Sequence, residues 1–134
     1  MPNDSHSEII ELFHLTPSGE LHGHFRVDMR ERGVLALLGW ALGAQSRVVQ
    51  IEVRSRGDVI ASAPPSVVRP DIADAFASRP DARTCGFEIL IEPQGSGESH
   101  LILEARLEDG TITPLGELRV STPRRRWTEF FRPS

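Results

Sequence analysis

Two histidines, His22 and His24, are separated by a single glycine, and His14 lies a short distance upstream. Alternate side chains of an extended strand lie on the same face, so this pair could present two imidazoles to a metal ion. Zinc requires three or four ligands in a tetrahedral arrangement, which two nitrogen donors do not complete. The spacing is therefore more typical of polar residues at the start of a strand, and we predict no metal and no cofactor.

Other motifs that carry chemistry are incomplete. The sequence has no Gly-x-Ser-x-Gly elbow, no His-Glu-x-x-His zinc motif and no Gly-x-x-x-x-Gly-Lys phosphate loop. The single cysteine, Cys85, precedes the apolar run GFEILI, which favours a small buried residue over a nucleophile. Arg56-Gly57-Asp58 spells an adhesion tripeptide, but a tight hairpin turn explains the same residues. We predict that the chain is not an enzyme.

Trp40, Arg69 and Asp71 are the candidates for ligand binding. Sugar sites combine an aromatic face with planar polar side chains, and these residues supply both. Each also has a purely structural interpretation. Arg69 and Asp71 flank Pro70 and could form a local ion pair that fixes the path of a loop. Trp40 is most simply a large residue of the core, and Gly39 before it is typical of a close approach between strands.

The C-terminal tail, residues 124–134, opens with three arginines and then places aromatic residues at helical spacing. Such a segment could lie on a membrane surface, stack on nucleic acid or dock on protein. Packing on its own domain, a neighbouring subunit or a further domain is the simplest interpretation. We therefore predict Trp127, Phe130 and Phe131 as interaction residues.

The elements that must position these residues are strands. Apolar and polar residues alternate in HFRVDM, VVQIEVRS, GFEILIE and HLILEARLE, as in half-buried antiparallel strands. Asp109-Gly110 and Arg56-Gly57 predict tight turns between such runs. Residues 35–42, LALLGWAL, favour a helix by composition, but the strands around them and the flanking glycines predict a strand.

One segment, RPDIADAF, departs from this pattern and predicts a short helix. Pro70 suits a first helical position, Asp71 suits the first turn, and Ile72 and Phe76 are four residues apart. About eight strands with regular turns predict an immunoglobulin-like antiparallel β-sandwich, whose open end this helical turn would cap. A jelly roll or a small barrel is the alternative. We expect residues 1–123 to form one domain, followed by the tail.

Composition narrows the class of protein. The chain has 134 residues, a net charge of −4 and 39% hydrophobic residues, which describes a soluble domain. The acidic balance gives no reason to expect nucleic acid binding. No apolar run reaches the roughly 18 residues of a membrane span. One cysteine allows no internal disulfide, and no signal peptide is recognisable, so we predict a cytoplasmic protein, whole or a fragment of a larger one.

A resemblance to a known family rests on four short pieces, which occur in the order Gly39-Trp40, Arg69 to Ile72 with Ala73 and Phe76, Gly86-Phe87, and LEDGTITPLGEL. The order resembles a small β-sandwich accessory module attached to bacterial glycosyltransferases and other enzymes of cell-surface polysaccharide. That module usually has an acidic residue shortly after Gly-Trp. This chain has Leu42-Gly43 at that place.

The resemblance implies a non-catalytic partner of surface-glycan enzymes. Such a partner could mediate protein–protein contact or oligomerisation through sheet edges and the aromatic tail, or it could bind carbohydrate. The absence of tyrosine and the small number of aromatic residues weigh against the carbohydrate alternative. We therefore favour a protein partner or self-association, with glycan binding as the alternative.

Overall fold

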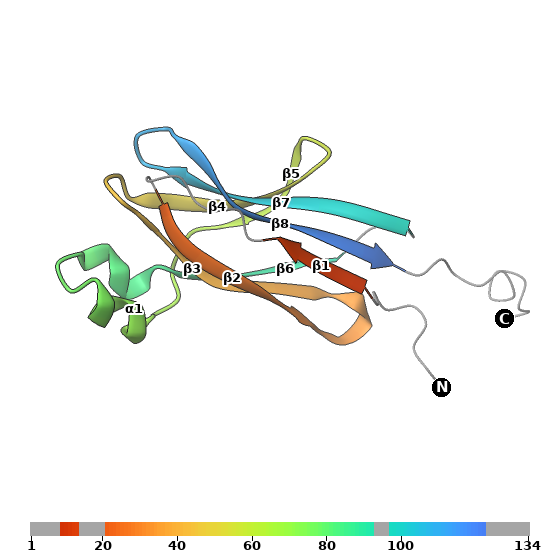
Figure 1. The fold of residues 1–134 in the computed structure, drawn as a ribbon, viewed down its shortest axis with the longest axis horizontal. Coiled ribbons are helices and arrows are strands. Elements are labelled where there is room, and N and C mark those ends of the chain that lie inside the picture. Colours follow the sequence, from red (N-terminus) through yellow and green to blue (C-terminus); the bar gives the residue numbers. More distant parts are fainter. Residues whose placement is uncertain (1–8, 14–20, 93–96, 123–134) are drawn as a thin grey trace, which may run out of the picture.

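The computed structural model describes residues 9–13, 21–92 and 97–122, and the tail and His14 lie outside these ranges. Eight strands and one short α-helix are described (Figure 1). Two 3₁₀ turns, η1 and η2, complete the set. The elements are β1(Ile9–Phe13), β2(Leu21–Met29), η1(Glu31–Gly33), β3(Leu35–Gly43), β4(Val48–Ser55), β5(Asp58–Ala63), α1(Pro70–Ala75), η2(Pro80–Thr84), β6(Gly86–Ile91), β7(Gly97–Leu107) and β8(Ile112–Thr122).

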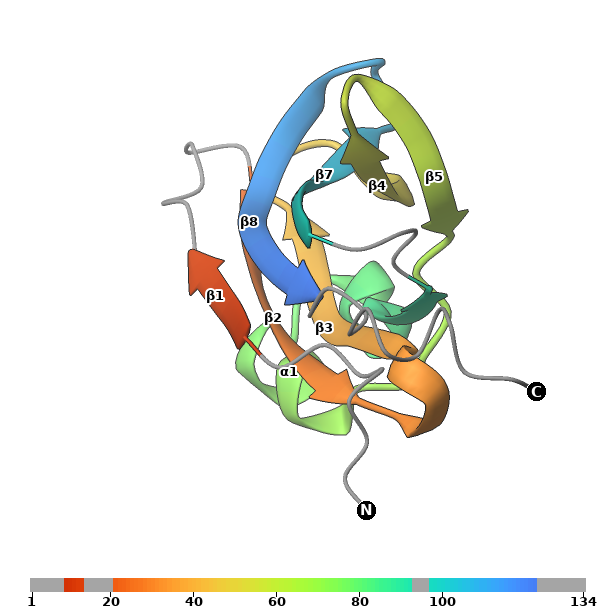
Figure 2. The same ribbon diagram turned by 90° about the vertical axis from the view of Figure 1, so that its right-hand side faces the viewer.

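The strands form two antiparallel sheets that pack face to face (Figure 2). The larger sheet has the order β1-β8-β7-β4-β5 and the smaller sheet has the order β2-β3-β6. The small sheet, β2-β3-β6, corresponds to strands A, B and E of an immunoglobulin domain. In the large sheet, the consecutive strands β8-β7-β4-β5 correspond to G, F, C and C′. The predicted all-β sandwich is confirmed, and the described strands form two separate sheets that do not close into a barrel. In place of strand D, the chain runs through residues 64–85, which carry α1 and η2.

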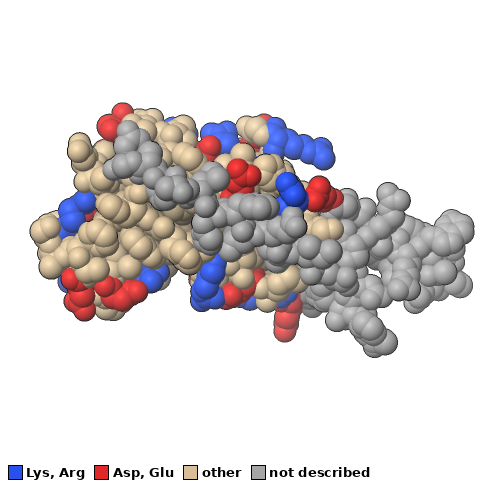
Figure 3. All heavy atoms as spheres, viewed as in Figure 1, with Lys and Arg blue, Asp and Glu red and all other residues tan. Residues whose placement is uncertain are grey.

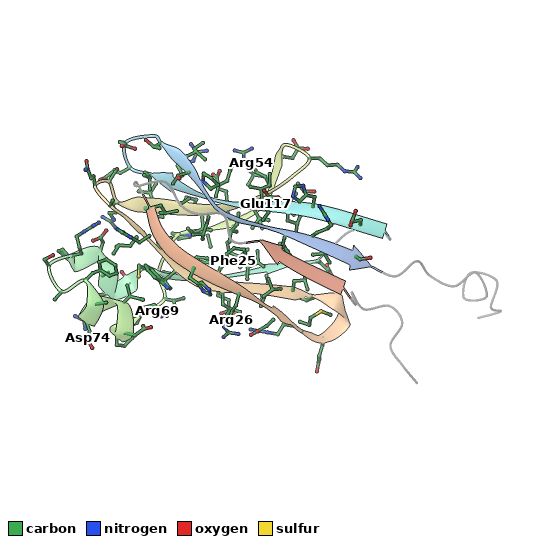
Figure 4. All side chains as sticks on the ribbon, viewed as in Figure 1. Phe25, Arg26, Arg54, Arg69, Asp74 and Glu117 are labelled. Atoms are coloured by element: carbon green, nitrogen blue, oxygen red, sulfur yellow. The ribbon has the colours of Figure 1, made fainter. Side chains whose placement is uncertain are left out.

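The central core comes from the alternate residues that each sheet turns inward. Phe25, Leu35, Leu37 and Phe87 of the small sheet meet residues of the large sheet such as Leu103, and all of them are buried. Figure 4 shows Phe25 between the sheets and Arg26, its neighbour in sequence, on the outer side. The predicted strand at LALLGWAL is therefore confirmed as β3, since its residues 35, 37 and 41 all belong to this core.

Trp40 does not belong to the central core, and the expectation that it does is wrong. Strand side chains alternate, so Trp40 and Leu42 lie on the face of β3 opposite Leu37 and Ala41. Trp40 is half-buried there, and its ring centroid lies 6.1 Å from that of Phe76. The large aromatic residue thus packs under the connection 64–85 and outside the sandwich core.

A second apolar cluster holds this connection on the small sheet. It contains Leu42 of β3 together with Ile72, Ala82 and Cys85 of the connection, with Trp40 and Phe76 packed against it. Helix α1 begins at Pro70, as predicted, and both residues of its predicted apolar pair contribute. As expected, α1 lies at one end of the sandwich (Figure 1). It packs there against the outer face of the small sheet near the end of β3, and Arg79 of the same connection donates a hydrogen bond to the Ala44 carbonyl oxygen of the β3–β4 turn at 3.2 Å.

Gly39 allows the three strands of the small sheet to approach each other in the core. It is paired with Phe25 of β2 on one side and with Phe87 of β6 on the other, and both phenylalanines are buried. A Cβ atom at Gly39 would collide with the His24 carbonyl oxygen and with the Phe25 backbone. The predicted close approach is therefore present, and the large residues it accommodates are Phe25 and Phe87.

We predict that Gly39→Ala lowers the free energy of unfolding by about 3 kcal/mol, because the added methyl group has no space between two paired strands. Urea denaturation followed by circular dichroism measures this change. Gly57→Ala is the matched control: Gly57 has φ +85° with no atom within 4 Å of an added Cβ, so backbone strain alone costs about 1 kcal/mol. Equal losses in the two variants would contradict the close approach at Gly39.

Candidate functional site

The residues of the Gly-Trp, Arg-Pro-Asp and Gly-Phe pieces come together at one place in the fold. Trp40 of β3 is paired with Gly86 of β6, and Gly86 forms a bridge with Val67. The Gly86 N–H donates to the Val67 carbonyl oxygen at 3.0 Å, and the Val67 N–H donates back at 2.9 Å. A Cβ at Gly86 would lie 2.8 Å from the Val67 oxygen, so this contact requires glycine. These pieces anchor the connection 64–85 to the edge of the small sheet.

The predicted ion pair between Arg69 and Asp71 is confirmed and is bidentate. Arg69 Nε donates to Asp71 Oδ1 at 3.0 Å, and Arg69 Nη2 donates to Asp71 Oδ2 at 2.8 Å. The hydrogen bonds from Arg69 hold the pKa of the Asp71 carboxyl below its ordinary value. The Arg69 backbone N–H also donates to the Arg83 carbonyl oxygen at 2.8 Å, so both parts of Arg69 fix the start of α1.

Trp40 and Arg69 line a shallow groove of about 410 Å³ on the outer face of the small sheet, named here the Trp40 groove. Asp71 does not line it but holds the Arg69 guanidinium beside it. Glu88 lines the groove as well and accepts a hydrogen bond from Arg30 at 3.3 Å. The full lining is His24, Arg26, Leu38, Gly39, Trp40, Val67, Arg69, Phe87 and Glu88.

A larger groove of about 770 Å³ lies on the side of the sandwich where both sheets end, and we name it the edge groove. Strand β5 is the outer strand of one sheet, β6 is the outer strand of the other, and the two contact each other. Leu90 is 56% exposed and Ile60 is 50% exposed on this side. The lining residues are Ser55, Arg56, Gly57, Ile60, Leu90, Ile91, Glu92, Glu98, Ser99, His100, Leu101 and Ile102.

Sequence reasoning missed the edge groove because it joins residues far apart in the chain. The one local signal was Leu90, an apolar residue at an outward position of the alternating run GFEILIE. Nothing local places Ile60 of β5 near Leu90 of β6, since the chain passes through α1 and η2 between them. Strands β5 and β6 become neighbours only because the chain joins the small sheet again as β6 after the connection 64–85.

The outer face of the large sheet carries paired charges. Arg54 Nε donates to Glu104 at 2.7 Å, and Arg106 makes two hydrogen bonds to Glu52, at 3.2 and 3.3 Å. Figure 4 places Arg54 and Glu117 on this face, on the side of the sandwich opposite Arg26. On the surface visible in Figure 3, arginines and acidic residues are interspersed. The outer face of the large sheet is therefore polar, whereas the edge groove combines polar residues with the exposed apolar side chains of Ile60 and Leu90.

The remaining predicted residues are placed as follows. His22 and His24 are exposed on β2, and the His22 ring centroid lies 5.3 Å from that of Phe76. Among the described residues, no three His, Cys, Asp or Glu side chains are grouped to hold a metal ion. Arg56 and Gly57 both have positive φ and form the predicted hairpin turn between β4 and β5.

Cys85 is buried in the second apolar cluster, as predicted, and this burial raises the pKa of its thiol. Trp127, Phe130 and Phe131 lie outside the described residues, so their predicted role is untested. No helix in the described part of the chain is long and apolar enough to cross a membrane.

Comparison with known proteins gave no match to a family model, to a curated protein or to a solved structure. The resemblance to accessory modules of glycosyltransferases therefore stays a prediction that rests on the motif residues alone.

We predict that the Asp71 carboxyl titrates below its ordinary pKa of 3.8, as a carboxyl-detected NMR titration would show. Because the folded pKa is lowered, its stabilising contribution is present above about pH 4 and is lost as the pH falls through the folded value. Arg69→Gln should return the Asp71 pKa towards 3.8.

The Asp109 carboxyl is the control for this titration. Its pKa is lowered by hydrogen bonds from Thr111, so it should not respond to Arg69→Gln. A wild-type Asp71 that titrates at its ordinary pKa would contradict the bidentate pair.

Proposed function

We propose that this chain is a non-catalytic protein-interaction module that associates with a second copy of itself, and that the edge groove is its contact surface. The observation that carries the proposal is the position of two outer strands side by side, with exposed Leu90 and Ile60 flanking the groove between them. Exposed apolar side chains that gather at a groove are typical of protein contact surfaces.

The strand edges themselves support the proposal. In the described part of the chain, β5 pairs with β4 alone, and β6 pairs with β3 and, at Gly86, with Val67. An outer strand offers backbone N–H and C=O groups to a further strand, and many proteins recognise extended segments in this way. The edge groove therefore combines backbone hydrogen-bonding groups with apolar surface.

The two outer faces of the sandwich are less suited to such contact. Burying the outer face of the large sheet would remove water from the Glu52–Arg106 and Arg54–Glu104 pairs, which is costly. The connection 64–85 already covers part of the outer face of the small sheet. Compared with these two faces, the edge groove offers exposed apolar side chains, Ile60 and Leu90, that a partner could cover.

The proposal also includes the cellular compartment of the protein and the enzymes beside which it works. A single cysteine, buried and unpaired, is in keeping with a reducing compartment, so we place the protein in the cytoplasm. The order of the motif pieces suggests a bacterial protein that works beside enzymes of surface-polysaccharide synthesis.

We predict that the full chain is a dimer by size-exclusion chromatography with light scattering, and that Leu90→Arg raises the dimer dissociation constant at least tenfold, about 1.4 kcal/mol. The substitution would remove an exposed apolar side chain from the contact and put a longer, strongly hydrated charged side chain in its place. Ile112→Arg is the matched control, since Ile112 is a similarly exposed residue at the start of β8 and does not line the edge groove. A monomeric wild-type chain, or an equal effect of the control, would overturn the proposal.

Carbohydrate recognition in the Trp40 groove is the second candidate function, and a specific observation favours it. Trp40, Arg69 and Glu88 line one groove, and Asp71 fixes the Arg69 guanidinium through two hydrogen bonds. An aromatic surface beside oriented charged donors and acceptors suits a sugar ring and its hydroxyls. The half-burial of Trp40 under Phe76 limits the indole area available for stacking.

For this second function we predict that Arg69→Gln abolishes binding of the full chain to a glycan array. Arg69 supplies charged donors at the groove, whereas Arg106 lies on the outer face of the other sheet, so Arg106→Gln is the matched control. Absence of binding by the wild-type chain, or binding that Arg69→Gln leaves unchanged, would exclude the Trp40 groove as a sugar site.

A further inference from the structure

The edge groove lies where the tail leaves the sandwich. Strand β8 ends at Thr122, which is paired with Gly97 at the start of β7. The next residues of β7, Glu98 to Ile102, line the edge groove. Trp127 is five positions after Thr122 in the sequence, so this aromatic residue can lie up to about 18 Å from the end of β8. Strand β8, after which the tail follows in sequence, therefore ends at the rim of the groove.

Charge distinguishes the tail from the rest of the chain. Residues 124–134 carry four arginines and one glutamate, a net charge of +3, whereas residues 1–123 carry eleven arginines and eighteen acidic residues, a net charge of −7. The edge groove is lined by two glutamates, Glu92 and Glu98, and by one arginine, Arg56. Glu98 is paired with Ser121 near the end of β8 and forms an ion pair with Arg119 at 3.6 Å. Opposite charges on the tail and on the groove rim favour their association.

The apolar residues of the two parts are also complementary. The tail supplies Trp127, Phe130 and Phe131. The groove supplies exposed Ile60 and Leu90 above buried residues such as Leu101. Tryptophan and other aromatic anchors that fill a pocket, surrounded by polar contacts, are typical of the residues that dominate protein interfaces.

The direction of β8 favours a second copy as the source of the tail. Figure 1 shows the C-terminal end of β8 pointing out of the sandwich at this end. Strand β7 is antiparallel to β8, so its groove-lining residues Glu98 to Ile102 lead back into the sandwich. The tail of the same molecule would have to reverse its direction to enter the groove. The tail of a copy related by a twofold axis at this end can enter without reversing.

We infer that the tail of one copy occupies the edge groove of a second copy, and that two copies exchange tails in this way. The groove and the origin of the tail lie in one surface patch, which makes this patch self-complementary, as a twofold interface requires. The basic residues 124–126 then lie against the acidic rim, and the aromatic residues lie against Ile60 and Leu90. The inference rests on the proposed self-association and names the segment that mediates it.

The test uses the full chain with Trp127, Phe130 and Phe131 all changed to alanine. We expect the dimer dissociation constant to rise at least tenfold in light scattering, with an unchanged circular dichroism spectrum. Thr128→Ala is the matched control in the same tail and should leave the dimer intact. A dimer that survives the triple substitution but is lost in Leu90→Arg would overturn the role of the tail and leave the proposed self-association standing.

A photo-crosslinking residue introduced at position 60 distinguishes a tail from the same molecule from a tail of the second copy. Equal amounts of ¹⁴N- and ¹⁵N-labelled protein are mixed, irradiated and digested for mass spectrometry. Crosslinks between position 60 and the tail in mixed-isotope pairs support exchange between copies. Crosslinks to the tail only within one isotope, or no crosslinks to the tail, would overturn the inference.

Discussion

The close approach of three strands at Gly39 is the constraint on which the small sheet depends. Phe25, Gly39 and Phe87 are paired in register across β2, β3 and β6, and the glycine leaves the space that its neighbours occupy in the core. Since strand side chains alternate, fixing Gly39 on the inner face places Trp40 on the outer face. The register of Gly39 thus decides that Trp40 packs against the connection 64–85 and not in the sandwich core.

A second glycine contact fixes the connection in turn. Gly86, which follows the buried Cys85, leaves space for the backbone of Val67. Arg69, two residues after Val67, is held by hydrogen bonds to the Asp71 carboxylate and to the Arg83 carbonyl oxygen. The connection that replaces strand D is therefore held by backbone hydrogen bonds, one bidentate ion pair and the second apolar cluster. The connection covers part of the outer face of the small sheet and pairs with the edge of β6 at Gly86, and the edge groove lies farther along the chain, beside Leu90 and Ile91 of β6.

The proposed functions differ in the physical interaction that each requires. Self-association requires apolar surface and free strand edges, and the edge groove combines the two. The opposite net charges of residues 1–123 and of the tail add attraction between copies. Sugar recognition uses an aromatic face and fixed charges, which the Trp40 groove offers in a smaller volume. The two grooves lie on different surfaces of the sandwich, so one molecule has room for both contacts.

The sequence by itself determined strands β2, β3, β4, β6 and β7, the hairpin turn at Arg56-Gly57, the helix start at Pro70 and the Arg69–Asp71 pair. These features depend on residues close in the chain, through side-chain alternation, turn conformation and short-range hydrogen bonds. Only the tertiary structure decided the face on which Trp40 lies and the formation of the edge groove. Both depend on which strands become neighbours, and that choice is made by packing between residues far apart in the sequence, which no local pattern encodes.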